Sequence, residues 1–216
     1  LIAKRGSRIK LIKVQQLKPS DQFFDQNFSI VEDGGSVEVV DVQLGSGFSA
    51  LSHDSVLAGR NSRSSIKSLY YGDQGSLMDL SYTMRHRGAH SESVILSKGA
   101  LDGDAKKVFR GNLIFETGSQ KSVGREKEVV VLLSENVKTD SIPALLCSED
   151  DVIGEHAASI GQVDQEKLFY LMSRGLSATE AKKLVVKAAF DEILLEIDDV
   201  NLRTQLMDAL DGRLTQ

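Results

Sequence analysis

Short apolar runs separated by turn residues dominate the first 160 residues, and they constrain the fold more than any other feature. Each run has the length of a strand and is rich in β-branched or aromatic side chains, which pack well on a pleated surface. Glycine-rich turn signals separate them, such as Asp33-Gly34-Gly35 and Asp102-Gly103-Asp104. This part of the chain is therefore predicted to be all-β. The main runs lie at residues 9–12, 37–44, 77–82, 94–96, 113–115, 129–133 and 144–147.

The spacing of these runs fits two architectures, a β-sandwich and a β-solenoid. Small polar residues and single glycines punctuate the runs, as expected where a chain turns a corner onto the next coil, and this favours the solenoid. No repeat of fixed length accompanies them, so periodicity alone leaves the choice open.

The pattern becomes helical near residue 163. Asp164 is placed to cap a helix, Gly175 to end it, and Ser177-Ala178-Thr179-Glu180 forms a capping box for the next helix. Leu202, Leu206 and Leu210 follow at helical spacing and predict a third helix. We therefore expect a β domain over residues 1–162 and a C-terminal helical domain over residues 163–216.

Composition narrows the classes of partner. The net charge of −5 and the pI near 5.4 give no support for a nucleic-acid or bilayer partner. A single cysteine, Cys147, excludes a disulfide within the chain and suits a reducing, cytoplasmic compartment. No apolar run has the length of a membrane span. The chain starts at Leu1 and enters strand-like sequence at once, so we expect a further N-terminal region before it.

Motifs for catalysis are missing from the sequence. There is no Walker-type phosphate loop, Cys-x-x-Cys, His-Glu-x-x-His or nucleophile elbow, so the chain is not predicted to be an enzyme. His86 and His90, four apart, would share one face of a strand, where a solvated polar face is the alternative to an ion site. Cys147 ends an apolar run and is expected to be a buried small hydrophobe. His156 lies among acidic residues, and Glu155 could orient its imidazole.

A series of motifs from Met84 to Gly175 resembles the B/D family of SUF iron–sulfur cluster assembly proteins, in the family's own order. No single piece is decisive, but the order and spacing over about ninety residues make coincidence implausible. The pieces are Met84-Arg85-His86-Arg87-Gly88, Ser97-Lys98-Gly99-Ala100-Leu101-Asp102, Val108-Phe109-Arg110-Gly111, Thr117-Gly118-Ser119-Gln120-Lys121, Leu132-Leu133-Ser134-Glu135, Glu149-Asp150-Asp151-Val152, Glu155-His156-Ala157-Ala158-Ser159-Ile160-Gly161 and Leu168-Phe169-Tyr170-Leu171-Met172-Ser173-Arg174-Gly175-Leu176.

The resemblance implies a right-handed parallel β-helix, or β-solenoid, flanked by helices. It also implies a scaffold that pairs with a B-type subunit or with itself through the β-helix and binds a SUF C-type ATPase through its C-terminal helices. The ATPase-binding residues would be Leu168, Phe169, Tyr170, Arg174 and Gly175.

Within this family the chain looks more like the D-type branch, because B-type members usually carry several cysteines. The family's candidate cluster-site histidine corresponds to His156, the candidate ligand for iron or a nascent cluster. Cys147 is displaced from the cysteine position of some D-type members and is a weaker candidate, and Glu126 stands where the family often has glutamine. We expect no stably bound cofactor in the isolated chain, only transient iron or an iron–sulfur cluster in the complex.

Two alternatives remain. The chain could be a B-type or single-gene B/D protein that scaffolds clusters as a homodimer. It could also be a β-helix enzyme acting on polysaccharide, but the absence of tryptophan and an aromatic content of 6% argue against a sugar-stacking groove.

Overall fold

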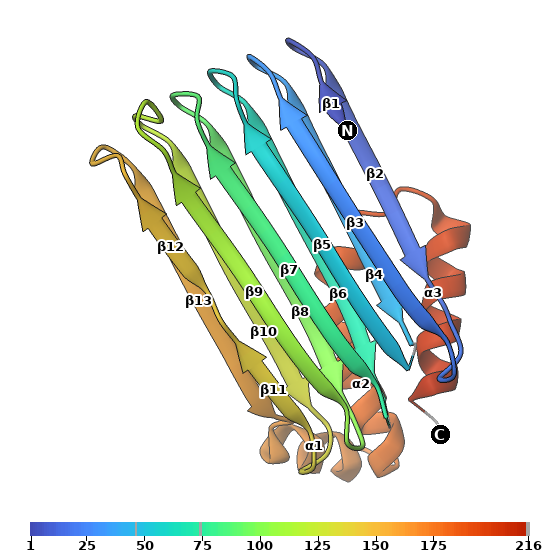
Figure 1. The fold of residues 1–216 in the computed structure, drawn as a ribbon. Helices are drawn as coiled ribbons and strands as arrows, with labels where there is room; N and C mark the ends of the chain where they lie inside the picture. Colours follow the sequence, from blue (N-terminus) through green and yellow to red (C-terminus); the bar gives the residue numbers. More distant parts are fainter. Residues whose placement is uncertain (46, 74, 215–216) are drawn as a thin grey trace.

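Two parallel β-sheets face each other and form a flattened solenoid with helices on one side (Figure 1). The computed structural model describes residues 1–45, 47–73 and 75–214. Sheet A contains β1 (Ile2–Ala3), β3 (Gln22–Val31), β5 (Phe48–Leu57), β7 (Leu77–His86), β9 (Lys106–Phe115), β11 (Lys138–Ser141) and β12 (Ala144–Cys147). Sheet B contains β2 (Arg8–Gln15), β4 (Ser36–Leu44), β6 (Arg63–Gly72), β8 (Glu92–Leu101), β10 (Val123–Leu132) and β13 (Ile153–Gln162).

The chain alternates between the sheets, so that each turn of the solenoid adds a strand to both. All neighbouring strands are parallel, which confirms the predicted solenoid over an antiparallel sandwich. Equivalent positions on successive turns are 27 to 31 residues apart, which explains why the sequence shows no repeat of fixed length. The ladder that defines this spacing runs through Arg8, Ser36, Arg63, Glu92, Val123 and Ile153.

Alternating side chains of the two sheets meet in the interior of the solenoid. Since successive strand residues point to opposite faces, every second residue is directed inward. Leu80, Tyr82 and Met84 of β7 pack there against Phe109 and neighbouring strands, and they are almost completely buried. Stacking of successive turns therefore produces one continuous hydrophobic core between the sheets.

Three helices follow the last strand, and their ends match the local signals in the sequence. The Asp164 side chain accepts hydrogen bonds from the first turn of α1, and Gly175, with a φ of +100°, follows its C-terminal end. Ser177 and Glu180 form the predicted capping box of α2. Among the described residues, no helix is both long and apolar enough to span a membrane. The helices are α1 (Gln165–Ser173), α2 (Ala178–Leu194) and α3 (Val200–Arg213).

The helices pack on the outer face of sheet B, behind the strands in Figure 1. Val42, Leu69 and Tyr71 of the sheet share a second hydrophobic core with side chains such as Phe190 and Leu206 of the helices. The expected boundary at residue 162 coincides with the end of β13. Because the helices cover apolar strand residues, however, they are an integral part of the packed structure; a separate helical domain stays a prediction.

Candidate functional site

The last strand of sheet B, β13, is an open edge. Among the described strands it pairs only with β10, and its residues from Glu155 to Gln162 are exposed. An edge strand of this length presents unpaired backbone N–H and C=O groups that can pair with another chain. His156 lies on this strand.

The register shows which way His156 points. It lies beside Glu126 of β10, whose neighbours Gly124 and Glu128 on the same face are buried in the interior. His156 therefore lies on the inward face of the last turn, and it is exposed because no further turn covers it. Glu155 lies on the opposite face and forms an ion pair with Arg125 at 3.0 Å, so the expectation that Glu155 orients His156 is wrong.

Glu126 is the unusual residue at this end of the solenoid. Its side chain is 4% exposed, and within the described structure its buried Oε2 atom has no hydrogen-bond partner. Space for it comes from Gly111, where an added Cβ would lie 2.7 Å from the Glu126 Cγ. Burial, together with the nearby Glu128 carboxylate, raises the pKa of Glu126 to about 7.

Glu128, two residues further along β10, is in contrast fully bonded. It forms a 2.6 Å ion pair with Lys107, both side chains being inaccessible to solvent. It also accepts hydrogen bonds from the Tyr70 hydroxyl at 2.8 Å and from Ser141. Burial lowers the pKa of Lys107, and the Glu128 carboxylate opposes this effect. Lys107 and Glu128 therefore form a closed ion pair in the core, whereas Glu126 is left without a partner at Oε2.

Cys147 ends β12, at the corner before β13. It is exposed, so the expectation of a buried cysteine is wrong; β12 belongs to the last turn, where nothing covers the inward face. Leu145 lies against Gly154, where an added Cβ would be 2.6 Å from the Leu145 Cδ1. Since β12 runs toward the corner and β13 away from it, Cys147 and His156 lie on opposite sides of this contact. The described residues contain no group of three or more His, Cys, Asp or Glu side chains placed to hold a metal ion.

His86 and His90 do not form a joint site. His86 is fully buried, bonded to Ser91 at 2.7 Å and Ser93 at 2.8 Å, and stacked on Phe115. Burial lowers its pKa to about 4, which makes it a neutral core residue. His90 lies in the following turn with a φ of +58°. Neither the ion site nor the solvated strand face considered from the sequence describes His86.

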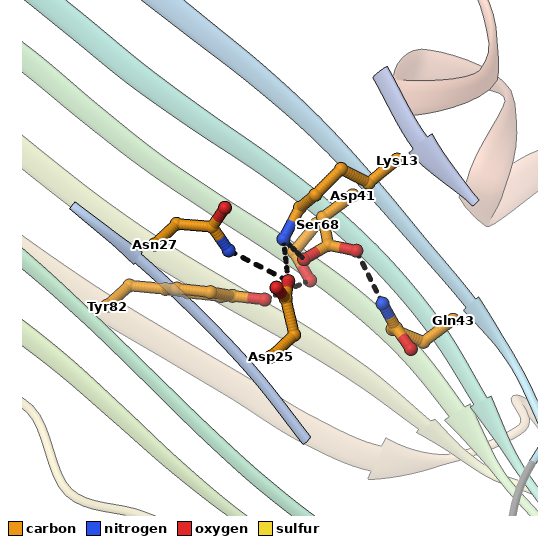
Figure 2. A network of polar contacts seen from close by, with 7 residues as sticks. All are labelled: Lys13, Asp25, Asn27, Asp41, Gln43, Ser68 and Tyr82. Atoms are coloured by element: carbon orange, nitrogen blue, oxygen red, sulfur yellow. Dashed lines mark hydrogen bonds and ion pairs between the residues drawn. The ribbon is translucent and has the colours of Figure 1, made fainter. Parts of the chain in front are cut away.

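A polar network occupies the interior near the other end of the solenoid (Figure 2). Lys13 forms ion pairs with Asp25 and, at 3.2 Å, with Asp41, and burial raises the pKa of Asp41. Two amides complete these carboxylates, Gln43 on Asp41 at 2.5 Å and Asn27 on Asp25 at 2.8 Å. The network compensates charges within the core, and only long-range register brings its members together.

The residues expected to bind an ATPase divide into two groups. Leu168 is buried in the core under the helices, so it cannot contribute an exposed contact. Phe169 and Tyr170 are 74% and 57% exposed on α1, and the Arg174 guanidinium lies 5.3 Å from the Tyr170 ring centroid. Gly175 supplies the left-handed backbone after the helix.

The family model that describes the SufBD core domain, of SUF system FeS cluster assembly, matches residues 1–189. The chain belongs to the SufBD family. This match covers the solenoid, α1 and most of α2, and thus includes the edge strand with His156. Members of this family act in the assembly of iron–sulfur clusters, as the resemblance implied.

Curated relatives agree with this membership. A protein of Bacillus subtilis named iron-sulfur cluster assembly protein SufD is 36% identical over 129 residues, which are 60% of this chain and 30% of that protein. A SufBD family protein of Mycobacterium leprae is 31% identical over 186 residues, 82% of this chain and 45% of that protein. One from Staphylococcus epidermidis is 29% identical over 172 residues, covering 78% of this chain and 36% of that protein. The chain thus spans less than half the length of these relatives.

Proposed function

We propose that the chain is part of a D-type scaffold subunit of the cytoplasmic SUF cluster-assembly complex, with no catalytic turnover of its own. The observation that carries the proposal is the position of His156, exposed on the open edge strand β13. Pairing of this edge with a B-type subunit, or with a second copy, would complete the backbone hydrogen bonds of sheet B. His156 would then lie next to the interface, where a neutral imidazole can ligate iron or a nascent cluster.

The same proposal assigns a second surface to the SUF C-type ATPase. Phe169 and Tyr170 are large exposed aromatic side chains on α1, and aromatic residues with arginine are enriched in protein interfaces. Leu168, on the other side of that helix, anchors it to the core. Two different partners can therefore bind at once, because the edge of sheet B and the exposed face of α1 are different surfaces.

Co-expression with a B-type subunit and the ATPase, followed by measurement of the mass of the complex, tests this function. The double variant Phe169→Ser/Tyr170→Ser should lose the ATPase and keep the B-type subunit. Leu195→Ser, at another exposed apolar residue of the helical segment, is the control and should keep both. ATPase binding by the double variant at the control's level would refute the α1 surface.

His156→Ala tests the site itself. The complex should form with its normal mass, because an exposed side chain contributes little to packing. Cluster assembly in cells should fall, since a ligand is removed. Wild-type cluster assembly by this variant would show that His156 is not a ligand, and a homodimer without a B-type subunit would favour the single-gene alternative.

A further inference from the structure

The carboxylate of Glu126 is the strongest unexplained feature of the described structure. A buried carboxylate without a partner is expensive, and native proteins keep one mainly where it binds or reacts with something. Its Oε2 atom lacks a hydrogen bond although Lys107 is present in the same interior, bonded to Glu128. The fold therefore keeps Glu126 available.

His156 occupies the neighbouring position of the same ladder and the same inward face. Adjacent parallel strands are about 4.8 Å apart. A cation with ligand distances of about 2.1 Å joins donor atoms roughly 3 Å apart, a span that two side chains on adjacent strands can reach. His156 is exposed at the open end of the solenoid, so an ion has a route to the pair.

We propose that Glu126 and His156 together form a divalent-cation site at the open end of the solenoid, suited to ferrous iron. One carboxylate oxygen and one imidazole nitrogen are a ligand set that Fe²⁺ and Co²⁺ accept. The remaining coordination positions face the open edge, where water fills them until a partner covers β13. The choice of iron rests on the proposed function, whereas the pair of ligands rests on the geometry alone.

Two other carboxylates near His156 do not have this role. Glu128 is held by Lys107 and Tyr70, so its oxygens are occupied. Glu155 points to the opposite face and pairs with Arg125. Glu155 is therefore a matched control for Glu126, because it has the same charge and is a direct chain neighbour of His156.

Metal binding by the purified chain tests the site directly. Fe²⁺ is titrated under anaerobic conditions by equilibrium dialysis, and Co²⁺ is titrated in parallel by its visible absorption spectrum. Glu126→Gln and His156→Ala should each weaken binding by about tenfold or more, in line with the loss of one ligand interaction. Glu155→Gln should bind as the wild type does. Circular dichroism of each variant verifies that the fold is retained.

The outcomes separate this inference from the proposed function. Wild-type affinity and an unchanged Co²⁺ spectrum in Glu126→Gln would overturn the inference, even if His156→Ala loses both binding and cluster assembly. Absence of any binding by the wild-type chain, alone and in the complex with its partners, would overturn it too. If His156→Ala also binds metal and assembles clusters normally, the ligand role of His156 in the proposed function fails as well.

Discussion

Replacing Glu126 by glutamine should stabilise the protein, and only at neutral to alkaline pH. The reason is the raised pKa of this carboxyl, about 7 in the fold against an ordinary 4.5. Between these two pH values the folded chain holds a proton that the unfolded chain has released, so stability declines as the pH rises through this window. The difference between the two pKa values corresponds to about 3 kcal/mol, which is the full penalty above pH 7.

Urea unfolding followed by circular dichroism at pH 5 and pH 8 measures this effect. Glu126→Gln keeps the shape of the side chain and removes the charge, so it should match the wild type at pH 5 within about 1 kcal/mol and exceed it by about 3 kcal/mol at pH 8. Glu155→Gln, at an exposed ion pair, should change stability by less than about 1 kcal/mol at both. A Glu126→Gln effect that does not depend on pH would refute the reasoning.

Two further predictions concern the interior. Lys107→Met should destabilise the protein by about 3–5 kcal/mol, because it leaves the buried Glu128 charge uncompensated, and Lys107→Met/Glu128→Gln should regain most of this loss; urea unfolding of both variants measures it. Acid should destabilise the wild type, because burial lowers the pKa of His53 and of His86 to about 4. Stability is complete above the ordinary value of 6.5 and falls by up to about 3 kcal/mol per histidine as the pH drops toward 4, which a series of urea midpoints would show.

Each of these has an outcome that contradicts it. A Lys107→Met variant within about 1 kcal/mol of the wild type would mean that the buried pair is not coupled as its 2.6 Å distance indicates. For the histidines, His86→Gln should flatten the pH dependence of unfolding, and His90→Asn, in a turn whose positive φ asparagine tolerates, should leave it unchanged. Equal slopes in both variants would contradict a buried neutral His86.

Signals that act over a few residues were predicted well from the sequence. The Asp164 cap, the Ser177 capping box and the glycine after α1 depend on neighbours three or four positions away, and all are present. The choice of a solenoid came from the family resemblance, because a turn length that varies from 27 to 31 residues hides the repeat.

Features that depend on the pairing of distant strands were missed. Cys147 has the apolar surroundings of a core residue, but its strand belongs to the last turn and it is exposed. Leu168 resembled the neighbouring Phe169 and Tyr170 in sequence, and only the packing of α1 on the core distinguishes it. Glu126 stood out solely as a departure from the family pattern; its burial and its ladder position beside His156 require the register of β10 and β13.

The position of Glu126 explains why a destabilising residue is useful at this end of the solenoid. In the first turns the interior charges of Lys13, Asp25 and Asp41 satisfy each other (Figure 2). In the last turn the inward face meets solvent, so a side chain there is both held by the core and open to a ligand. Under the proposed pairing through β13, a partner would close this face over Glu126 and His156. Iron bound between them would then be shielded from water while the interface is formed, and opening of that interface would release it.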